Sequence, residues 1–414
     1  MHGRLAVGCM LVVVAGGCAR SAPSLAPVPA AIAPGVDVLL SDSLALVRGR
    51  RVGLVTNQAG IDAKGKGDVQ RLRAAGIDVV ALFSPEHGYR GSAAPGAAVA
   101  SSVDRASGLP IYSLYGRTRV PTGQMLGGLD VVLVDLQDVG ARYYTYLATT
   151  VDVMRGAARV HKPVVILDRP DPIGGAVQGN VLDPAFSSDV GLLAVPMRHG
   201  MTLGELAGLA RSDLNLGTDL SVIPVRGWRR DQAFDATGLP FVSPSPNLPT
   251  LESLFHYPGL CLFEGTDLSV GRGSNAPFEQ VGAPWLDTVA VLARLRKSRL
   301  PGVAFRGVTF TPIRPGDGKY ADTLLSGIRL AVTDRATYDP TATAVYLLSI
   351  IRAVHPGQFA FLDTEFDRLA GGPELRLALQ QGEAPRRIVR GWAADRAAFL
   401  KRRAPFLIYP GPAR

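Results

Sequence analysis

Residues 129–140 have the sequence Leu-Asp-Val-Val-Leu-Val-Asp-Leu-Gln-Asp-Val-Gly. The apolar part of this stretch is continuous and does not alternate with polar residues, which is typical of a β-strand buried on both faces. From Asp135 onward the residues are mostly polar or glycine, so the strand is expected to end there in a turn. A buried strand followed by a polar turn is the repeating unit of a parallel α/β sheet.

The same pattern recurs on both sides of this stretch. Four further strands are predicted at Arg51–Thr56, Asp78–Phe83, Pro110–Leu114 and Pro163–Leu167. Helical spacing occupies Asp68–Ala75 and Tyr143–Val160, and Gly76 stands where a helix C-cap belongs. This alternation predicts an α/β fold, a mostly parallel sheet with helices on both faces, whose functional side chains gather at the carboxyl ends of the strands.

Composition restricts the class of protein. Of the 414 residues, 47% are hydrophobic and 19% are charged, which excludes a disordered chain, and three cysteines exclude a small disulfide scaffold. The formal net charge is +9, but the arginines are scattered, so no nucleic-acid partner is expected. A segment rich in proline and glycine at 238–259 marks the transition between a first domain, predicted at 36–255, and a smaller α+β domain at 256–414.

The N-terminus predicts export. Residues 5–17 are apolar or glycine and follow Arg4, which is typical of a secretory signal and too short for a membrane span. Small residues precede Cys18, as in a bacterial lipobox, so residues 1–17 are interpreted as a signal peptide and 18–35 as a lipidated, disordered tether. The alternative is an ordinary cleaved signal. In both cases we expect a cell-envelope protein, and in the first case it contacts the membrane only through its lipid.

The strongest local signal is Ser84-Pro85-Glu86-His87-Gly88, at the end of the second predicted strand. We expect Glu86 to act as a general acid, with His87 and the loop that follows shielding it from water. The alternative is a carboxylate that caps a helix.

Polar residues also follow the later strands. Asp138 and Arg142 precede three tyrosines, beginning at Tyr143, that form either a sugar-binding wall or a helix packing face. Asp168 ends the fifth strand and belongs either to the site or to a salt-bridged turn. By contrast, Glu205 stands at the capping-box position of a helix and is expected to be structural.

Glu264 and Asp267 lie in a dense polar segment that leads into Gly271-Arg272-Gly273, and we predict that this segment binds a ligand. Glycines on both sides of Arg272 allow backbone N–H groups and a guanidinium to converge on a carboxylate.

Common cofactor and hydrolase motifs are missing from the sequence. It contains no G-x-S-x-G, S-x-x-K or H-E-x-x-H string, and the near match to a P-loop at 60–67 has Gly67 where Ser or Thr must hold magnesium. We therefore predict no cofactor and no metal.

In order along the chain, the motifs are GLVTNQAG, SPEHGYRG, IYSLYG, DVVLVDLQDVGARYYTY, LDRPDPIGG, VQGNVLD, MRHGMTLGEL, SPNLP and FEGTDLSVGRGS. Over residues 35–410 the chain resembles the NamZ-like exo-β-N-acetylmuramidase family, formerly a domain of unknown function. The resemblance implies a glycosidase that removes N-acetylmuramic acid from the non-reducing end of peptidoglycan fragments. It also implies a Rossmann-like domain, a smaller partner domain, an active site in the cleft between them, and Glu86 as the catalytic glutamate.

The sequence allows more than one second catalytic group, more than one ligand for the substrate carboxylate, and other functions. The 2-acetamido group of the sugar can replace a second carboxylate, with Asp138, Asp168 or Asp267 orienting it. For the lactyl carboxylate of muramic acid, Arg272 is the first candidate and Arg142 the second, unless Arg272 only pairs with Glu264 or Asp267. Two other functions are a non-catalytic wall-binding lipoprotein and a different hydrolase on the same scaffold.

Overall fold

A computed structural model describes residues 1–3, 5–6, 8–10 and 31–411. Residues 31–411 belong to one compact unit. The predicted lipidation site, Cys18, and residues 19–30 of the predicted tether lie outside the described residues. Among those described, no helix combines the length and the apolar character needed to cross a bilayer.

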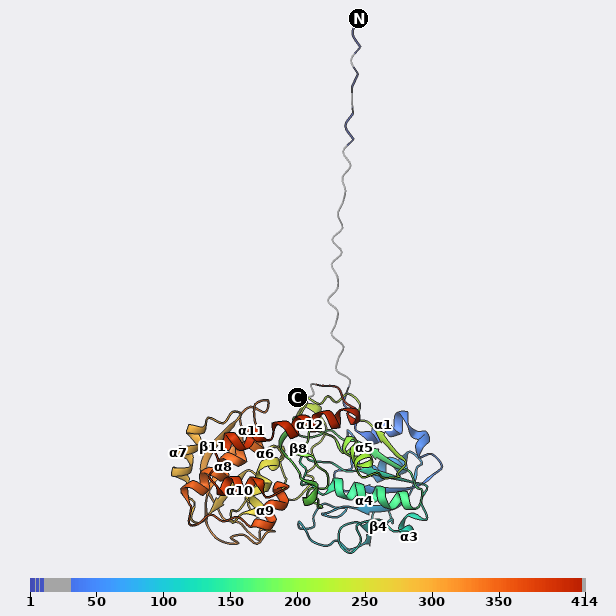
Figure 1. Cartoon of the computed structure of the whole chain (residues 1–414). Helices are drawn as coiled ribbons and strands as arrows, with labels where there is room; N and C mark the ends of the chain where they lie inside the picture. The colour runs from blue at the N-terminus through green and yellow to red at the C-terminus, as the bar shows by residue number, and fades with distance from the viewer. Residues whose placement is uncertain (4, 7, 11–30, 412–414) are drawn as a thin grey trace. The chain divides into compact units, whose positions relative to one another are not determined.

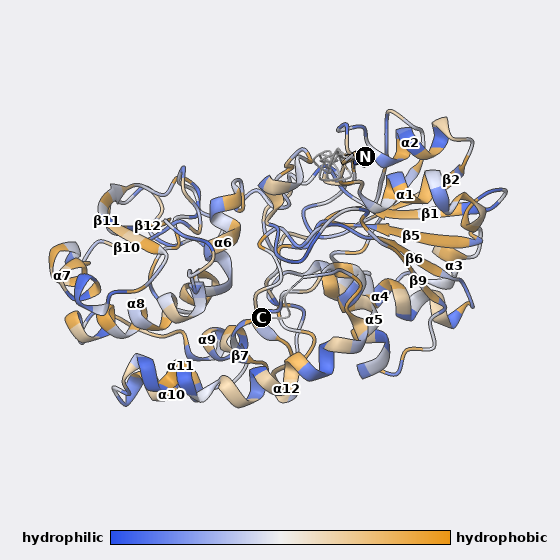
Figure 2. Ribbon diagram, turned by 90° about the horizontal axis from the view of Figure 1, so that it is seen from above, coloured by the Kyte–Doolittle hydropathy of each residue, from blue (hydrophilic) through white to orange (hydrophobic). Residues whose placement is uncertain are grey.

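The central sheet of the first lobe (residues 31–250) confirms the predicted fold class. Its seven strands lie in the order β3-β4-β2-β1-β5-β6-β9, and every neighbouring pair is parallel except β3 with β4. Figure 2 shows the strongly hydrophobic strands β1, β5, β6 and β9 side by side. The strands are β1 (Arg51–Thr56), β2 (Asp78–Ser84), β3 (Ser102–Val103), β4 (Pro110–Ser113), β5 (Val131–Asp135), β6 (Val164–Leu167) and β9 (Leu220–Ile223).

Two separate cores cover the two faces of this sheet, which explains the continuous apolar runs. In β5, Val131 and Leu133 belong to the core that contains α1 and α2, whereas Val132 and Val134 belong to the core that contains α4 and α5. Successive side chains of a strand point to opposite faces, so each face needs its own apolar set. The helices of this lobe are α1 (Gly35–Asp42), α2 (Asp68–Ala74), α3 (Gly123–Leu126), α4 (Tyr146–Arg159) and α5 (Leu203–Asp213).

The predicted helix at 143–160 is three residues too long at its start. The backbone of Arg142 donates to Met197 O at 3.1 Å, and Ala141 forms a β-bridge with Arg198. These contacts hold the chain extended, so α4 begins only at Tyr146. The bridge joins the hairpin of β7 (Gln178–Val181) and β8 (Pro196–Arg198).

The second lobe (residues 251–392) has an antiparallel sheet in the order β10-β12-β11 with helices around it. Helix α6 begins inside the segment predicted as a transition and contains Pro258. The elements are α6 (Leu251–Leu260), β10 (Gln280–Ala283), α7 (Thr288–Ser298), β11 (Val303–Phe310), β12 (Leu325–Val332), α8 (Pro340–Val354), α9 (Asp363–Ala370), α10 (Glu374–Gln380) and α11 (Pro385–Gly391).

The last part of the chain returns to the first lobe. Helix α12 (Ala393–Arg403) is drawn red in Figure 1. In the segment after it, the Tyr409 hydroxyl donates a hydrogen bond to the Asp168 carboxylate and accepts one from Val225 N at 3.0 Å. Arg403 donates to the carbonyls of His199 and Gly200 at 3.0 and 2.8 Å. The first lobe is therefore completed by residues from the C-terminal end.

Candidate active site

Glu86 lies in a sharp turn at the carboxyl end of β2. The N–H of Gly88 donates to Pro85 O at 3.0 Å, and His87 and Gly88 have φ angles of 69° and 73°. A left-handed conformation is uncommon for a residue with a side chain, and such residues cluster at functional sites. The turn places Glu86 two residues after the end of β2, at the strand end where the sequence predicted it.

The Glu86 carboxylate is held at both oxygens by neutral donors. Gly96 N donates to Oε1 at 2.8 Å, and the Thr145 hydroxyl bonds to Oε2 at 2.7 Å. Glu86 is 9% exposed. It does not cap a helix, because the Gly96 donor lies in a loop and the next helix along the chain, α3, is capped by Thr122. The capping alternative is therefore wrong.

A cavity of about 380 Å³ opens beside Glu86 and is bounded by both lobes. First-lobe residues on its wall include Tyr115, Thr145 and Asn247, and second-lobe residues include Glu264 and Arg272. The complete lining is Glu86, His87, Pro95, Gly96, Tyr115, Tyr143, Tyr144, Thr145, Asp189, Val190, Ser245, Asn247, Leu248, Tyr257, Cys261, Glu264, Arg272, Phe278, Glu365, Arg368 and Leu369.

Glu86 differs from the other carboxylates on the cavity wall because, among the described residues, each of them forms an ion pair with an arginine and Glu86 does not. Glu264 pairs with Arg272 at 2.5 Å, Asp189 with Arg119 at 3.1 Å, and Glu365 with Arg368 at 2.5 Å. Within residues 31–411, no Arg, Lys or His forms an ion pair with Glu86. Proton transfer at Glu86 therefore breaks no salt bridge.

His87 and Tyr115 flank the carboxylate. His87 Nδ1 lies 2.8 Å from Ala93 O; since a carbonyl only accepts, Nδ1 donates this hydrogen bond and Nε2 is the ring nitrogen left for other contacts. Burial, and then the charge of Glu86, raise the pKa of Tyr115 to about 12. Tyr115 is thus a neutral hydrogen-bonding group at ordinary pH.

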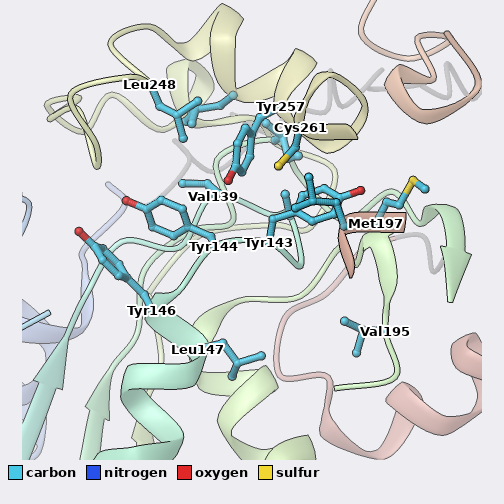
Figure 3. Close-up of a cluster of buried hydrophobic side chains, with 14 of the residues drawn as sticks. Val139, Tyr143, Tyr144, Tyr146, Leu147, Val195, Met197, Leu248, Tyr257 and Cys261 are labelled. Carbon is cyan, nitrogen blue, oxygen red and sulfur yellow. The ribbon is translucent and has the colours of Figure 1, made fainter. Parts of the chain in front are cut away.

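The tyrosine cluster is divided between the cavity wall and helix α4. Tyr143 and Tyr144 line the cavity, while Tyr146 lies in the first turn of α4 and accepts from Asn57 Nδ2 at 2.6 Å. Tyr143 packs edge-on against Tyr257 with ring centroids 6.0 Å apart. In Figure 3, Tyr257 and Cys261 of the second lobe lie beside Tyr143 and Tyr144 of the first.

Arg272 pairs with Glu264, as its structural alternative predicted, and it also lines the cavity. Its Nε donates to Glu264, and its guanidinium lies over the Phe278 ring at 5.0 Å from the centroid. Burial opposes the charged form, but the Glu264 carboxylate outweighs it and raises the pKa of Arg272. Among residues 31–411 no acceptor takes its two Nη groups, so these donors are available to the cavity.

Two other predicted ligands are absent from the cavity wall because their polar groups serve internal contacts. The Arg142 guanidinium donates to the carbonyls of Asn180, Leu369 and Ala370 at 2.8, 2.9 and 2.7 Å, which ties the lobes together. Burial lowers the pKa of Arg142. Asp138 accepts from Gly140 N at 2.8 Å and faces His199 Nε2 at 3.4 Å.

Asp168 and Asp267 also lie away from the cavity. Asp168 accepts from Thr202 Oγ1 at 2.6 Å and Gly204 N at 2.9 Å, and burial raises its pKa to about 6. Asp267 accepts from Ala360 N at 3.1 Å, and burial raises its pKa.

The other charged residues of the turn that begins at Asp168 form the salt-bridged turn that was the structural alternative for this motif. Arg169 donates to Asp135 Oδ2 at 2.9 Å, so the motif contains a buried salt bridge. Asp171, fully buried beside His199, Asp138 and Arg198, has its pKa raised to about 7 by burial.

Glu205 is structural as expected. Its carboxylate completes the α5 capping box with Thr202 and pairs with Arg230. Within the described ranges, no group of three or more His, Cys, Asp or Glu side chains is arranged to hold a metal.

Sequence reasoning did not single out Thr145, Gly96, Tyr115 or Asn247 as site residues. Tyr115 and Asn247 stand inside IYSLYG and SPNLP, so the motifs contained a signal for them. Gly96 lies in a loop without any motif, and only the folded chain brings its N–H to Glu86.

The protein is a two-lobed α/β protein with a Rossmann-like lobe and a smaller α+β lobe. Among the residues described, the cavity between the lobes contains a single unpaired carboxylate, an arrangement suited to acid catalysis. The N-terminal and C-terminal regions of "Exo-beta-N-acetylmuramidase NamZ" match residues 52–252 and 255–409. The chain belongs to the exo-β-N-acetylmuramidase NamZ family.

Individual relatives agree with this membership. The chain is 42% identical over 378 residues to the peptidoglycan β-N-acetylmuramidase NamZ of Bacillus subtilis (strain 168), covering 91% of each chain. Two crystal structures of DUF1343 family proteins from Bacteroides fragilis NCTC 9343 are similar to it. One has a TM-score of 0.83 at 31% identity and covers 91% of this chain and 99% of its own. The other has a TM-score of 0.76 at 30% identity, with 92% and 99% covered.

Proposed function

We propose that this protein is an exo-acting glycoside hydrolase that releases N-acetylmuramic acid from the non-reducing end of peptidoglycan fragments. The observation that carries the proposal is Glu86, which lies in a cavity bounded by both lobes and has only neutral partners. Membership of the NamZ family supplies the substrate class.

Glu86 donates the proton to the oxygen of the departing sugar. Because Gly96 N can only donate, the Oε1 atom that accepts from it carries no proton. The transferable proton of Glu86 therefore belongs on Oε2. The Thr145 hydroxyl both donates and accepts, so it bonds to Oε2 before and after transfer. The carboxyl group therefore keeps its position throughout the proton transfer.

The acetamido group of the substrate acts as the second catalytic group. Each other carboxylate on the wall is bound to an arginine, which lowers its value as a nucleophile or base. An acetamido oxygen that attacks the anomeric carbon needs no second carboxylate from the protein. Tyr115 and Asn247, both on the wall, are suited to hydrogen-bond the amide and ring hydroxyls.

Arg272 binds the lactyl carboxylate that distinguishes muramic acid from N-acetylglucosamine. Its Nη groups are available to the cavity, and a guanidinium is suited to bind two carboxylate oxygens.

Incubation with the disaccharide of N-acetylmuramic acid β-linked to N-acetylglucosamine tests the proposed reaction. We expect release of both sugars, and no hydrolysis when N-acetylglucosamine replaces the muramic acid. Binding without release, retained in Glu86→Gln, would instead indicate a non-catalytic wall-binding protein.

We also propose that the protein is exported and held at the cell envelope by a lipid on Cys18. The support is the apolar stretch 5–17 and the small residues before Cys18. Cys18→Ala should move the protein from the membrane fraction to the soluble fraction. Unchanged membrane fractionation would contradict the anchor.

A further inference from the structure

Lys319 lies in the loop between β11 and β12, and its ammonium faces backbone carbonyls. Nζ is 2.5 Å from Thr266 O, 2.9 Å from Glu264 O, 3.2 Å from Leu268 O and 3.4 Å from Phe263 O. An ammonium has three N–H donors, so these four oxygens, here called the carbonyl cage, fill its hydrogen-bonding capacity. Within residues 31–411, Lys319 forms no ion pair.

The chemistry of the carbonyl cage is that of a monovalent-cation site. Carbonyl oxygens that converge on one point repel one another through their partial negative charges, and a cation at the centre removes that repulsion. Lysine provides a compact charge, whereas the planar guanidinium of arginine suits carboxylates. Only six of the 44 basic residues in this chain are lysines, and one of them occupies this position.

The carbonyl cage is part of the segment that carries the ion pair of the active-site cavity. Glu264 contributes its carbonyl to the cage and its carboxylate to Arg272. Backbone contacts also hold the same segment: Asp267 N donates to Ala360 O at 3.1 Å, Leu362 N donates to Gly265 O at 2.9 Å, and Ile313 N donates to Gly273 O at 2.8 Å. Lys319 adds a cation that contacts four carbonyls of the segment at once.

The loop that carries Lys319 also reaches the first lobe. A Cβ placed on Gly316 would lie 3.5 Å from Cδ of Pro95. Pro95 lines the cavity and precedes Gly96, the residue whose N–H bonds to Glu86. The loop therefore contacts the Glu264 segment through Lys319 and approaches Pro95 through Gly316.

We propose that the Lys319 ammonium is a built-in cation that organises the carbonyls of 263–268 and thereby positions Glu264 and Arg272 at the cavity wall. Lys319 is a positioning residue, because it is not part of the cavity lining. Whether the carbonyl cage binds a cation does not depend on which reaction the protein catalyses. The expected effect of the cage on substrate binding rests on the proposed function.

Lys319→Ala empties the carbonyl cage and leaves room for an external cation. In tetramethylammonium chloride, whose cation is too large for the cage, we expect KM for the muramic acid disaccharide to rise at least about tenfold, since charged hydrogen bonds are lost. The value of kcat should change less, because Glu86 keeps Gly96 and Thr145. Potassium or ammonium chloride at the same ionic strength should restore KM.

Thermal unfolding without substrate tests the cage by itself. The unfolding midpoint of Lys319→Ala should rise with potassium chloride relative to tetramethylammonium chloride, because an ion that binds only the folded state stabilises it. This difference should exceed that of the wild type and of Lys297→Ala, which removes an exposed lysine from α7. Lys319→Gln, whose amide can fill the cage, should fold, show a raised KM and lack the potassium response.

The outcomes are distinct. A Lys319→Ala midpoint and KM that respond equally to the two salts overturn the built-in cation. A potassium-dependent midpoint with a wild-type KM overturns the positioning role. If Lys319→Ala fails to fold in every salt, a wild-type KM for Lys319→Gln overturns the proposal. If the wild type releases no muramic acid, the proposed function fails, while the thermal measurement still decides the cage.

Discussion

The hydroxyl of Thr145 lies 2.7 Å from Oε2 of Glu86, although the two residues are 59 positions apart in the chain. Glu86 follows strand β2, and Thr145 is the residue before helix α4. The contact therefore depends on the parallel sheet, which brings the turns after β2 and β5 to the same edge.

Replacing Glu86 by glutamine keeps the size of the side chain and removes its transferable proton. We expect kcat on the natural disaccharide to fall ~10²–10⁴-fold, the usual contribution of general acid catalysis. Glu383→Gln, which changes a glutamate paired with Arg387 outside the cavity lining, is the matched control. Activity of Glu86→Gln within a few-fold of wild type would exclude it as the acid.

Thr145→Val removes a hydroxyl and nearly preserves volume. Because the hydrogen bond to the carboxylate is lost, kcat should fall about tenfold or more, with KM changed little. Thr145→Ser keeps the hydroxyl and should recover most of the activity. A near-wild-type kcat for Thr145→Val together with a loss in Thr145→Ser, measured by steady-state kinetics, would show that packing by the methyl group is what matters.

Arg272→Met should weaken turnover of the muramic acid substrate by about ten- to hundredfold through loss of charged hydrogen bonds. An analogue without the lactyl carboxylate should be processed equally by the variant and the wild type. The double variant Glu264→Gln/Arg272→Met controls for the carboxylate that the single change leaves unpaired. Equal losses on both substrates would make Arg272 a structural residue.

Stability should decrease as pH rises through neutrality, in part because of Asp171. Burial raises its pKa from 3.8 to about 7, so the folded state holds a proton that the unfolded state has already released. The resulting stability is fully present below about pH 4 and is lost as pH rises through 7. Asp171→Asn should therefore show a smaller fall in unfolding midpoint between pH 5 and 8 than wild type does. An identical fall in the two proteins would contradict this assignment.

The sheet was predictable because its strands are buried on both faces. The continuous runs in β1, β2, β5 and β6 carry that information locally. By contrast, β3 has two exposed residues and β9 is half-buried, so neither differs from a loop in sequence pattern.

The site was predictable only where a residue's neighbours in sequence determine its position. Glu86 and Arg272 lie in turns whose proline and glycines are adjacent to them. Asp168 directly follows β6 and Arg142 lies between β5 and α4, but their partners Tyr409 and Leu369 stand more than 220 residues later. Contacts at such separations leave no local pattern.

The return of residues 393–411 to the first lobe affects how the chain is made. Asp168 receives the Tyr409 hydroxyl, and Glu205 accepts from Ile408 N at 2.7 Å. Synthesis proceeds from the N-terminus, so residues 31–392 of both lobes have been translated before these partners emerge. The second lobe, encoded between the two parts of the first, can therefore fold while the first is still incomplete, and residues 393–411 complete the first lobe afterwards.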